Sequence, residues 1–239
     1  AIFTALLIGT IIWGDSYATV ISANGKDTLD VFIIAGALLV ATGAIDDRFK
    51  LGVFVRIISE VAVALIIIEG LDLNLRNLGS LIGPTPIELP VSLAYPFTIV
   101  AIVGLINAFN MLDGLDGLLA SLVIFTLLNF HIFTHTAPGI VTIFIGASLL
   151  AFLISNLSIS PLVPHTFLGD AGSRLLGFIV VCLLLSASSG QIGTSKMIQP
   201  VTALYVVALP LFDMSFTVLR RLLRNKSPFE PDRSHIHHL

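Results

Sequence analysis

The feature that most constrains this chain is a series of long apolar runs, separated by short stretches rich in Gly, Pro, Asn, Asp and Ser. A helix needs about 20 apolar residues to cross a bilayer. The runs are too long for strands and do not alternate strictly, so helices are favoured. We expect the helices at roughly 1–21, 29–45, 51–69, 91–112, 117–134, 138–157, 174–189 and 200–223.

The composition excludes a water-soluble globular domain. Of the 239 residues, 56% are hydrophobic and only 11% are charged, against about 25% charged in an ordinary soluble domain. The sequence therefore predicts an all-α, polytopic transmembrane bundle of about eight spans. A net charge of -3 gives no basic surface for nucleic acid. The single cysteine, Cys182, excludes an intrachain disulfide.

No internal repeat, linker or shift in composition divides the chain, so we expect residues 1–239 to form a single membrane-embedded domain. Ala1 lies within an apolar run that no basic segment precedes, which is unlike a signal peptide. We expect this domain to be truncated at both ends, with neighbouring spans missing.

Successive spans place successive loops on alternate sides of the membrane, which sorts the polar stretches into two groups. Three of the 12 basic residues, Lys26, Arg76 and Lys196, fall on one side, and the other nine fall on the opposite side. The positive-inside rule makes that second side cytoplasmic. It also collects four unusual polar clusters, at 46–47, 107–116, 167–170 and 235–238. We therefore expect one composite site there.

The first cluster is the adjacent pair Asp46 and Asp47. Neighbouring carboxylates repel one another unless a cation or a basic group compensates them, and Mg²⁺ with phosphate oxygens is one such compensator. A solvated helix end with Arg48 and Lys50 as counter-charges is the simpler alternative. The pair alone does not decide between them.

The second cluster contains Asn107, Asn110 and Asp113, spaced three residues apart near one helical face, and then Asp116. Its two Asp-Gly pairs favour a turn that a ligand can approach closely. Asp-Gly is also common in ordinary turns. Two amides and two carboxylates at a bilayer boundary exceed what a turn requires, so we favour a functional role.

The third cluster, around Phe167 and Asp170, leaves two interpretations open. Asp170 fits an N-cap, with Ser173 near the first turn of the following helix. It fits a cation ligand equally well, because flexible glycines flank it.

The fourth cluster places His235, His237 and His238 next to Arg233. A zinc hydrolase is a weak interpretation because no cysteine or His-Glu-x-x-His pattern accompanies them. Hydrogen bonding to phosphate or sugar fits these side chains as well.

Ionisable residues also lie within the apolar runs and at their ends. Arg56 is four residues from Glu60 and is expected to neutralise it. Asp213 should face protein or water, since a carboxylate in lipid is costly. His131 and His135 fall on the other side of the membrane and are interpreted as interfacial residues.

Four motifs, read together, resemble those of the polyprenyl-phosphate N-acetylhexosamine-1-phosphate transferase family, most closely its bacterial WecA-type branch. They occur in the family's order and span nearly the whole chain. The matching segments are Gly-Ala-Ile-Asp-Asp-Arg-Phe at 43–49, Asn-Ala-Phe-Asn-Met-Leu-Asp-Gly-Leu-Asp-Gly-Leu at 107–118, Phe-Leu-Gly-Asp-Ala-Gly-Ser at 167–173, and Ser-Pro-Phe-Glu-Pro-Asp-Arg-Ser-His-Ile-His-His-Leu at 227–239.

The resemblance implies a reaction in which undecaprenyl phosphate attacks the sugar-bearing phosphorus of UDP-N-acetylglucosamine and releases UMP. It implies Mg²⁺ as the cofactor, with Mn²⁺ as a possible substitute. The implied metal ligands are Asp170 and Asn110, and the implied acidic pair at the reacting phosphates is Asp46 and Asp47. The implied substrate-binding residues are Asn107, Asp113, Asp116, Phe167, Arg233, His235, His237 and His238.

The resemblance also implies a setting and partners. The His-Ile-His-His form at 235–238 resembles the N-acetylglucosamine branch. The family has ten or eleven spans and acts at the cytoplasmic face of the bacterial inner membrane, where it initiates lipid-linked surface polysaccharide such as O-antigen. Another UDP-N-acetylhexosamine donor and a homodimer stay open.

Three other functions remain as alternatives. A cation transporter would use Asp46, Asp213 and the histidines as a relay, but it predicts polar residues throughout the bilayer. An Asp-rich prenyltransferase is disfavoured by the histidine motif. A binding protein derived from the enzyme is the third.

Overall fold

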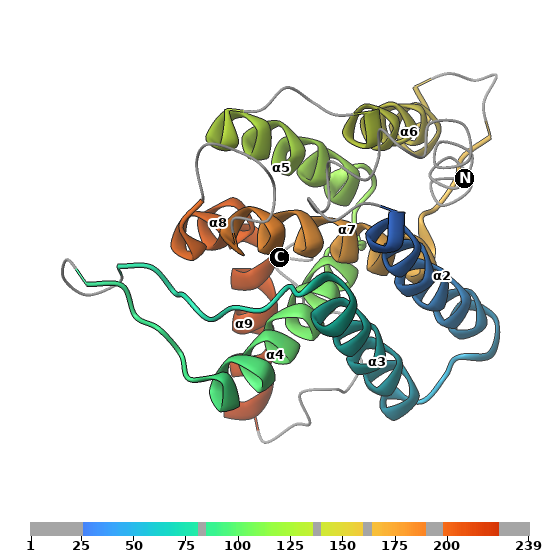
Figure 1. The fold of residues 1–239 in the computed structure, drawn as a ribbon. Helices are drawn as coiled ribbons and strands as arrows, with labels where there is room; N and C mark the ends of the chain where they lie inside the picture. The colour runs from blue at the N-terminus through green and yellow to red at the C-terminus, as the bar shows by residue number, and fades with distance from the viewer. Residues whose placement is uncertain (1–25, 81–84, 136–139, 160–163, 190–197, 225–239) are drawn as a thin grey trace.

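The computed structural model describes residues 26–80, 85–135, 140–159, 164–189 and 198–224. Regular structure in these ranges is helical, apart from one isolated bridge between Asn77 and Glu88. The helices, labelled as in Figure 1, are α2 (Lys26–Phe49), α3 (Val53–Leu71), α4 (Val91–Met111), α5 (Leu118–Thr134), α6 (Ile140–Asn156), α7 (Gly169–Ser189), α8 (Pro200–Val206) and α9 (Ala208–Leu223).

The prediction of an all-helical membrane protein is confirmed. Every apolar run expected from residue 29 onward contains a helix in the structure, whereas the expected helix at 1–21 lies outside the described residues. Among the described helices, α4 and α7 are each long and apolar enough to cross a membrane, and the bent pair α8 and α9 makes a third span if it is taken as one. The expected number of spans thus stays a prediction.

Helix α7 forms the centre of the bundle. Every residue from Ser173 to Ser188 is buried, and α7 packs against α2, α4, α5 and α8 (Figure 1). Within the apolar window of each candidate span, 89% of α7 is buried inside the protein but only 28% of α4. The uninterrupted apolar run of α7 follows from this position, because a helix surrounded on all sides has no polar face.

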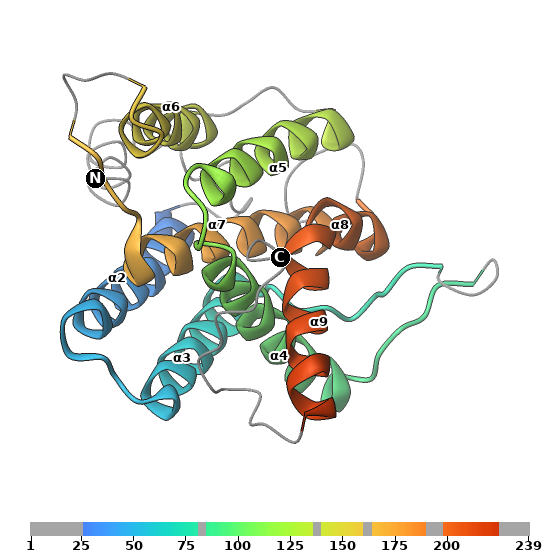
Figure 2. The ribbon, with the colours of Figure 1, turned by 180° about the vertical axis from the view of Figure 1, so that it is seen from behind.

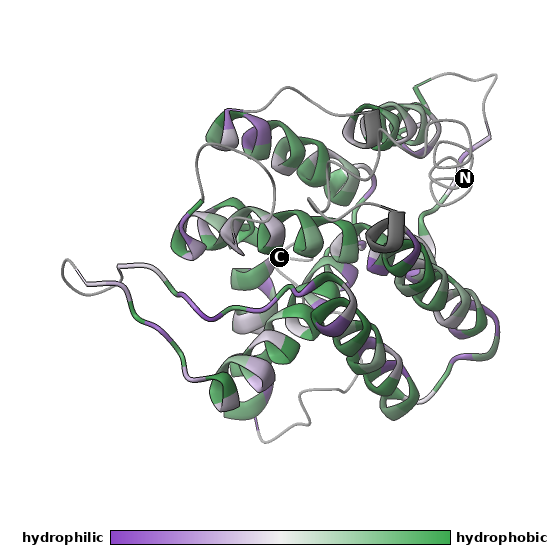
Figure 3. Cartoon of the chain, in the orientation of Figure 1, coloured by the Kyte–Doolittle hydropathy of each residue, from purple (hydrophilic) through white to green (hydrophobic). Residues whose placement is uncertain are grey.

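The outer helices carry exposed apolar side chains, which suits a bundle that faces lipid. Exposed examples include Phe54, Val100, Phe125 and Phe212. In Figure 3 the helices are mostly hydrophobic, and hydrophilic colour gathers on the extended segment between α3 and α4 and where α2 meets α7.

The last expected helix, 200–223, is wrong as a single continuous helix. The chain bends by 78° between α8 and α9, at Val207 (φ -107°, ψ 23°). Pro210 lies in the first turn of α9 and has no N–H to donate. Its ring would clash with the carbonyl of Val206 in a straight helix, so the break falls between the two residues.

Candidate active site

Three segments that are distant in sequence meet at the first turn of α7. The backbone N–H of Asp170 donates to Asp47 Oδ1, at the end of α2, over 3.0 Å. Ser173 Oγ donates to Asn110 Oδ1, at the end of α4, over 2.5 Å. Figure 2 shows these three helix ends together on one side of the bundle. Three of the four polar clusters therefore adjoin one another.

Gly169 permits the approach of Asp47 to α7. It has φ +68°, and a Cβ at this position would lie 2.8 Å from Asp47 Oδ2. The carboxylate of Asp47 sits against the N-terminus of α7, where free N–H groups and the helix dipole favour negative charge. Asp170 itself lies in the first turn of the helix, and Asp47 accepts the bond from its backbone N–H, so the structure does not bear out the N-cap, one of the two interpretations left open for Asp170.

The two adjacent aspartates have different surroundings. Asp46 is only 4% exposed, whereas Asp47 is exposed. Both oxygens of Asp46 are engaged: Oδ1 accepts the Leu51 N–H over 2.7 Å, and Oδ2 accepts Arg174 Nη2 over 2.7 Å and Arg56 Nη1 over 3.4 Å. Asp46 thus lies behind the surface that Asp47 presents.

Arg174 was not among the predicted site residues, yet it stands at the centre of the cluster. It is 1% exposed, and besides Asp46 its guanidinium lies 3.5 Å from Asp170 Oδ2 and 3.8 Å from Glu60 Oε1. A planar guanidinium offers five donors in a fixed fork, which suits several carboxylates at once. The sequence feature that could have identified Arg174 is its position four residues after Asp170 on the same helix, where two side chains can pair.

The expected pairing of Arg56 with Glu60 is corrected. Within the described part of the chain, the ion pair of Arg56 is with Asp46. The carboxylate of Glu60 accepts a hydrogen bond from Asn107 Nδ2 and lies near Arg174. Glu60 points into the protein rather than along its own helix surface, so it binds groups of α4 and α7. Asn107, predicted to bind substrate, contacts Glu60 in this structure.

Asp113 lies in the turn after α4 and is half-buried. Burial raises its pKa to about 7, and the nearby charges of Asp170, Asp47 and Asp116 add to this effect. Carboxylates crowded in this way favour a bound cation, because a cation lowers the cost of ionising all of them.

The remaining predicted residues in the described ranges, Asp116 and Phe167, form a separate part of the same region. Asn156 donates to Asp116 Oδ1 over 3.3 Å and to the Thr166 carbonyl over 2.9 Å. His165 Nε2 lies 3.7 Å from Asp116 Oδ2, and its ring meets that of Phe167 edge to face at 4.6 Å. Asn156 and His165 were missed because nothing in their local sequence distinguishes them.

The donors near Asp170 fit a hard divalent cation. They are carboxylate and amide oxygens, from Asp47, Asp113, Asp170 and Asn110, which are the ligand types that Mg²⁺ prefers. Among the described residues no three acidic, His or Cys side chains converge closely enough to ligate one metal ion. Mg²⁺ commonly takes only one or two carboxylates and completes its shell with waters and substrate phosphates, so the donor set is compatible with it.

Other predicted positions lie elsewhere. Arg233, His235, His237 and His238 fall outside the described residues. Asp213 is buried in the protein on α9, as expected of a carboxylate kept out of lipid.

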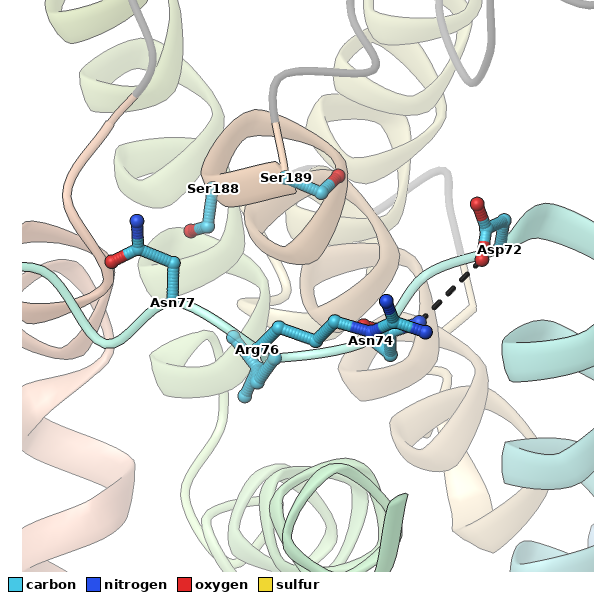
Figure 4. Close-up of a pocket in the computed structure, with 7 residues that line it drawn as sticks. Asp72, Asn74, Arg76, Asn77, Ser188 and Ser189 are labelled. Atoms are coloured by element: carbon cyan, nitrogen blue, oxygen red, sulfur yellow. Dashed lines mark hydrogen bonds between the residues drawn. The ribbon is translucent and has the colours of Figure 1, made fainter. Parts of the chain in front are cut away.

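A polar hollow of about 240 Å³ lies at the end of α7 opposite the acidic cluster (Figure 4). Asp72, Asn74, Arg76 and Asn77 line it from the segment after α3, and Ser188 and Ser189 from the end of α7. The 21 residues of α7 span about 30 Å, so this hollow is far from Asp170 and shares no residue with the acidic cluster.

A helical bundle with an acidic, oxygen-rich cluster at one end of a buried central helix defines an integral membrane protein whose cluster offers the oxygen donors that divalent cations prefer. Residues 29–188 match glycosyl transferase family 4, and the chain belongs to that family.

The chain is also similar to curated proteins named undecaprenyl-phosphate alpha-N-acetylglucosaminyl 1-phosphate transferase. It is 39% identical to the protein from Salmonella typhi over 223 residues, which cover 88% of this chain and 58% of that protein. The protein from Yersinia pestis is 35% identical over 230 residues, covering 95% and 62%. The one from Haemophilus influenzae is 37% identical over 215 residues, covering 87% and 59%. The chain thus spans about three fifths of the length of these relatives.

Proposed function

We propose that this protein transfers N-acetylglucosamine-1-phosphate from UDP-N-acetylglucosamine to undecaprenyl phosphate. An oxygen of the lipid phosphate forms a bond to the sugar-bearing phosphorus. The bond from that phosphorus to the bridging oxygen of the diphosphate breaks, and UMP leaves. The product is a lipid-diphosphate-linked sugar, which initiates a surface polysaccharide.

The observation that carries this proposal is the meeting of Asp47, Asn110 and Asp170 at the start of α7 in a member of glycosyl transferase family 4. The names of the relatives supply the substrates. Phosphoryl transfer asks the protein mainly to position its reactants and to neutralise their charge. Oxygen ligands for a cation, drawn from three helices, meet the second demand.

Each part of the site has a task in this reaction. A bound Mg²⁺ would neutralise the charge on the diphosphate, and Asp47, Asp170 and Asn110 would hold it. A phosphate monoester is mostly dianionic at pH 7, so the lipid nucleophile needs little help from a general base. A covalent aspartyl-phosphate intermediate is therefore the less favoured route. Exposed Phe167 provides an aromatic face for the uracil, beside Asp116.

The acidic end of the bundle is proposed to face the cytoplasm, where UDP-sugars occur. Arg48 in the last turn of α2, Lys50 in the loop and Arg56 in the first turn of α3 lie at this end, as the positive-inside rule requires of a cytoplasmic side. We also propose that the chain supplies eight spans of a ten- or eleven-span protein in the bacterial inner membrane. We further propose that this protein forms a homodimer.

The direct test is to incubate the purified protein with undecaprenyl phosphate, Mg²⁺ and either UDP-N-acetylglucosamine or UDP-N-acetylgalactosamine, and to measure UMP. Release of UMP that depends on the lipid and favours the first sugar supports the proposal. A preference for the second sugar changes the donor and keeps the reaction class. No release with any UDP-sugar removes the transferase assignment.

Removal of divalent cations by EDTA is expected to abolish UMP release. The physical reason is that Asp47, Asp113 and Asp170 would then repel the diphosphate instead of binding it through a cation. Activity should return with added Mg²⁺ or Mn²⁺ and not with Na⁺ at equal ionic strength. Full activity in EDTA would contradict a role for a metal.

The substitution Phe167→Ala is expected to raise the KM for the UDP-sugar about 10-fold and to change kcat little, because base stacking on an aromatic ring contributes about 1–3 kcal/mol. The ring is 77% exposed, so its removal leaves no cavity. Phe167→Tyr should keep the wild-type KM. Phe125→Ala, which removes an exposed ring of α5, is the matched control; an equal rise in KM there would show that the effect is not specific.

A further inference from the structure

The structure gives the two adjacent aspartates different surroundings. The side chains of consecutive helical residues point about 100° apart, so one carboxylate can face inward while the next faces outward. Asp46 faces inward, and both its oxygens already accept hydrogen bonds from protein groups. Asp47 faces outward, and its Oδ1 accepts a hydrogen bond from the backbone N–H of Asp170. Only Asp47 has an exposed carboxylate to offer a ligand.

The inward group belongs to a largely buried cluster of ion pairs, which Asp170 joins through Arg174. Asp46 and Glu60 supply two negative charges, and Arg174 and Arg56 supply two positive ones. The side chains of Asp46, Glu60 and Arg174 are at most 4% exposed. Charges buried to this degree require partners, because each has lost its hydration. Asp47 takes part in none of these ion pairs, whereas Asp170 borders them through Arg174.

We infer that Arg174 is a positioning residue: it holds Asp46 behind the site and so directs Asp47 and Asp170 toward the cation and the phosphates. The part of this inference that concerns kcat rests on the proposed function. The inference assigns the two members of the acidic pair different tasks, whereas the motif by itself treats them alike.

The contacts of Arg174 explain how it acts at a distance from the substrate. Its Nη2 lies 2.7 Å from Asp46 Oδ2 on α2 and 3.5 Å from Asp170 Oδ2 on α7. One nitrogen thereby bridges the two helices at the site. The bond between Asp47 and the Asp170 backbone lies one residue away and depends on the spacing of the same two helices. Loss of the guanidinium would therefore remove the ion pair of Asp170 and, through the shift of the helices, move Asp47 indirectly.

A double-mutant cycle tests the inference through kcat. Arg174→Leu should lower kcat about 100-fold, since misplacement of reacting groups by about 1 Å costs that much, and since it leaves Asp46 and Glu60 buried without their shared cation. Adding Asp46→Asn should restore kcat to within about 10-fold of wild type, because partners in one ion pair are not additive. Arg174→Lys should fall between Arg174→Leu and wild type, as a single ammonium cannot serve three carboxylates.

The outcome that overturns the inference is a double variant no more active than Arg174→Leu, or an Asp46→Asn variant as inactive as Asp47→Asn. Either result would mean that Asp46 itself touches substrate or metal. Failure of the proposed function gives a different pattern, in which the wild-type protein releases no UMP at all.

A second measurement does not depend on transferase activity. Mn²⁺ binding to the purified protein, followed by electron paramagnetic resonance, should weaken about 10-fold in Asp46→Asn, which acts from behind the site, and at least about 100-fold in Asp47→Asn and Asp170→Asn, which would hold the ion. Melting temperatures without added metal show whether each variant folds. If Arg174→Leu does not fold, Mn²⁺ binding to the three aspartate variants still tests the inference. An equal loss of Mn²⁺ affinity in Asp46→Asn and Asp47→Asn would contradict the inference.

Discussion

Replacing Asp170 by asparagine is expected to lower kcat about 1,000-fold, the loss typical of removing one group that stabilises transition-state charge. The carboxylate of Asp170 lies in the first turn of α7 and is 38% exposed, with Asp47 bonded to its backbone N–H. Asparagine keeps the size of the side chain and the helix, and removes only the charge that a cation would bind.

The measurement is UMP release at saturating concentrations of both substrates, made after the melting temperature has shown that the variant is folded. Asp30→Asn is the matched control. It removes one exposed carboxylate from the same helix as Asp46 and Asp47, but near the opposite end of α2. The control should keep at least half the wild-type kcat. An Asp170→Asn variant as active as Asp30→Asn would exclude Asp170 from catalysis.

The sequence predicts the helices and the meeting of the clusters for one physical reason. In a bilayer each apolar run must cross the hydrocarbon core, and each polar stretch must stay at a membrane surface. Successive loops therefore lie on opposite sides, which assigns a side to every loop. This placed the end of α2, the end of α4 and the start of α7 together, and the bonds of Asp170 to Asp47 and of Ser173 to Asn110 join them in the structure.

The internal pairing could not be predicted in the same way. Arg174 and Asp46 are 128 residues apart, and hydropathy does not specify how neighbouring helices are rotated about their axes. Glu60 had a suitable basic residue one turn away, yet its carboxylate points toward α4 and α7. Rotation is set by packing, as where Gly43 of α2 lets the backbone of Ala171 approach. The bend at Val207 was foreseeable from Pro210 and was missed because both halves are apolar.

The substitution Gly43→Ala is expected to lower kcat about 100-fold and to destabilise the fold. A Cβ at Gly43 would lie 2.4 Å from Ala171 Cα and 2.8 Å from its backbone nitrogen. The obstruction is backbone, so no change of rotamer relieves it, and α2 must move away from α7. Alanine gains about 1 kcal/mol in helix propensity, but overpacking typically costs about 1–3 kcal/mol. We expect the cost to exceed the gain because the contact is so short.

The effect on kcat follows from the position of Gly43, one turn before Asp46 and Asp47 on α2. A shift of about 1 Å there misplaces Asp47 relative to Asp170, and errors of that size cost about 100-fold in rate. Gly52→Ala is the matched control, since no atom lies within 4 Å of its added Cβ and its φ of -62° suits alanine. Kinetics and melting curves of the two variants should differ sharply. If Gly43→Ala matched Gly52→Ala in both, the close packing of α2 on α7 would not be what holds Asp47 in place.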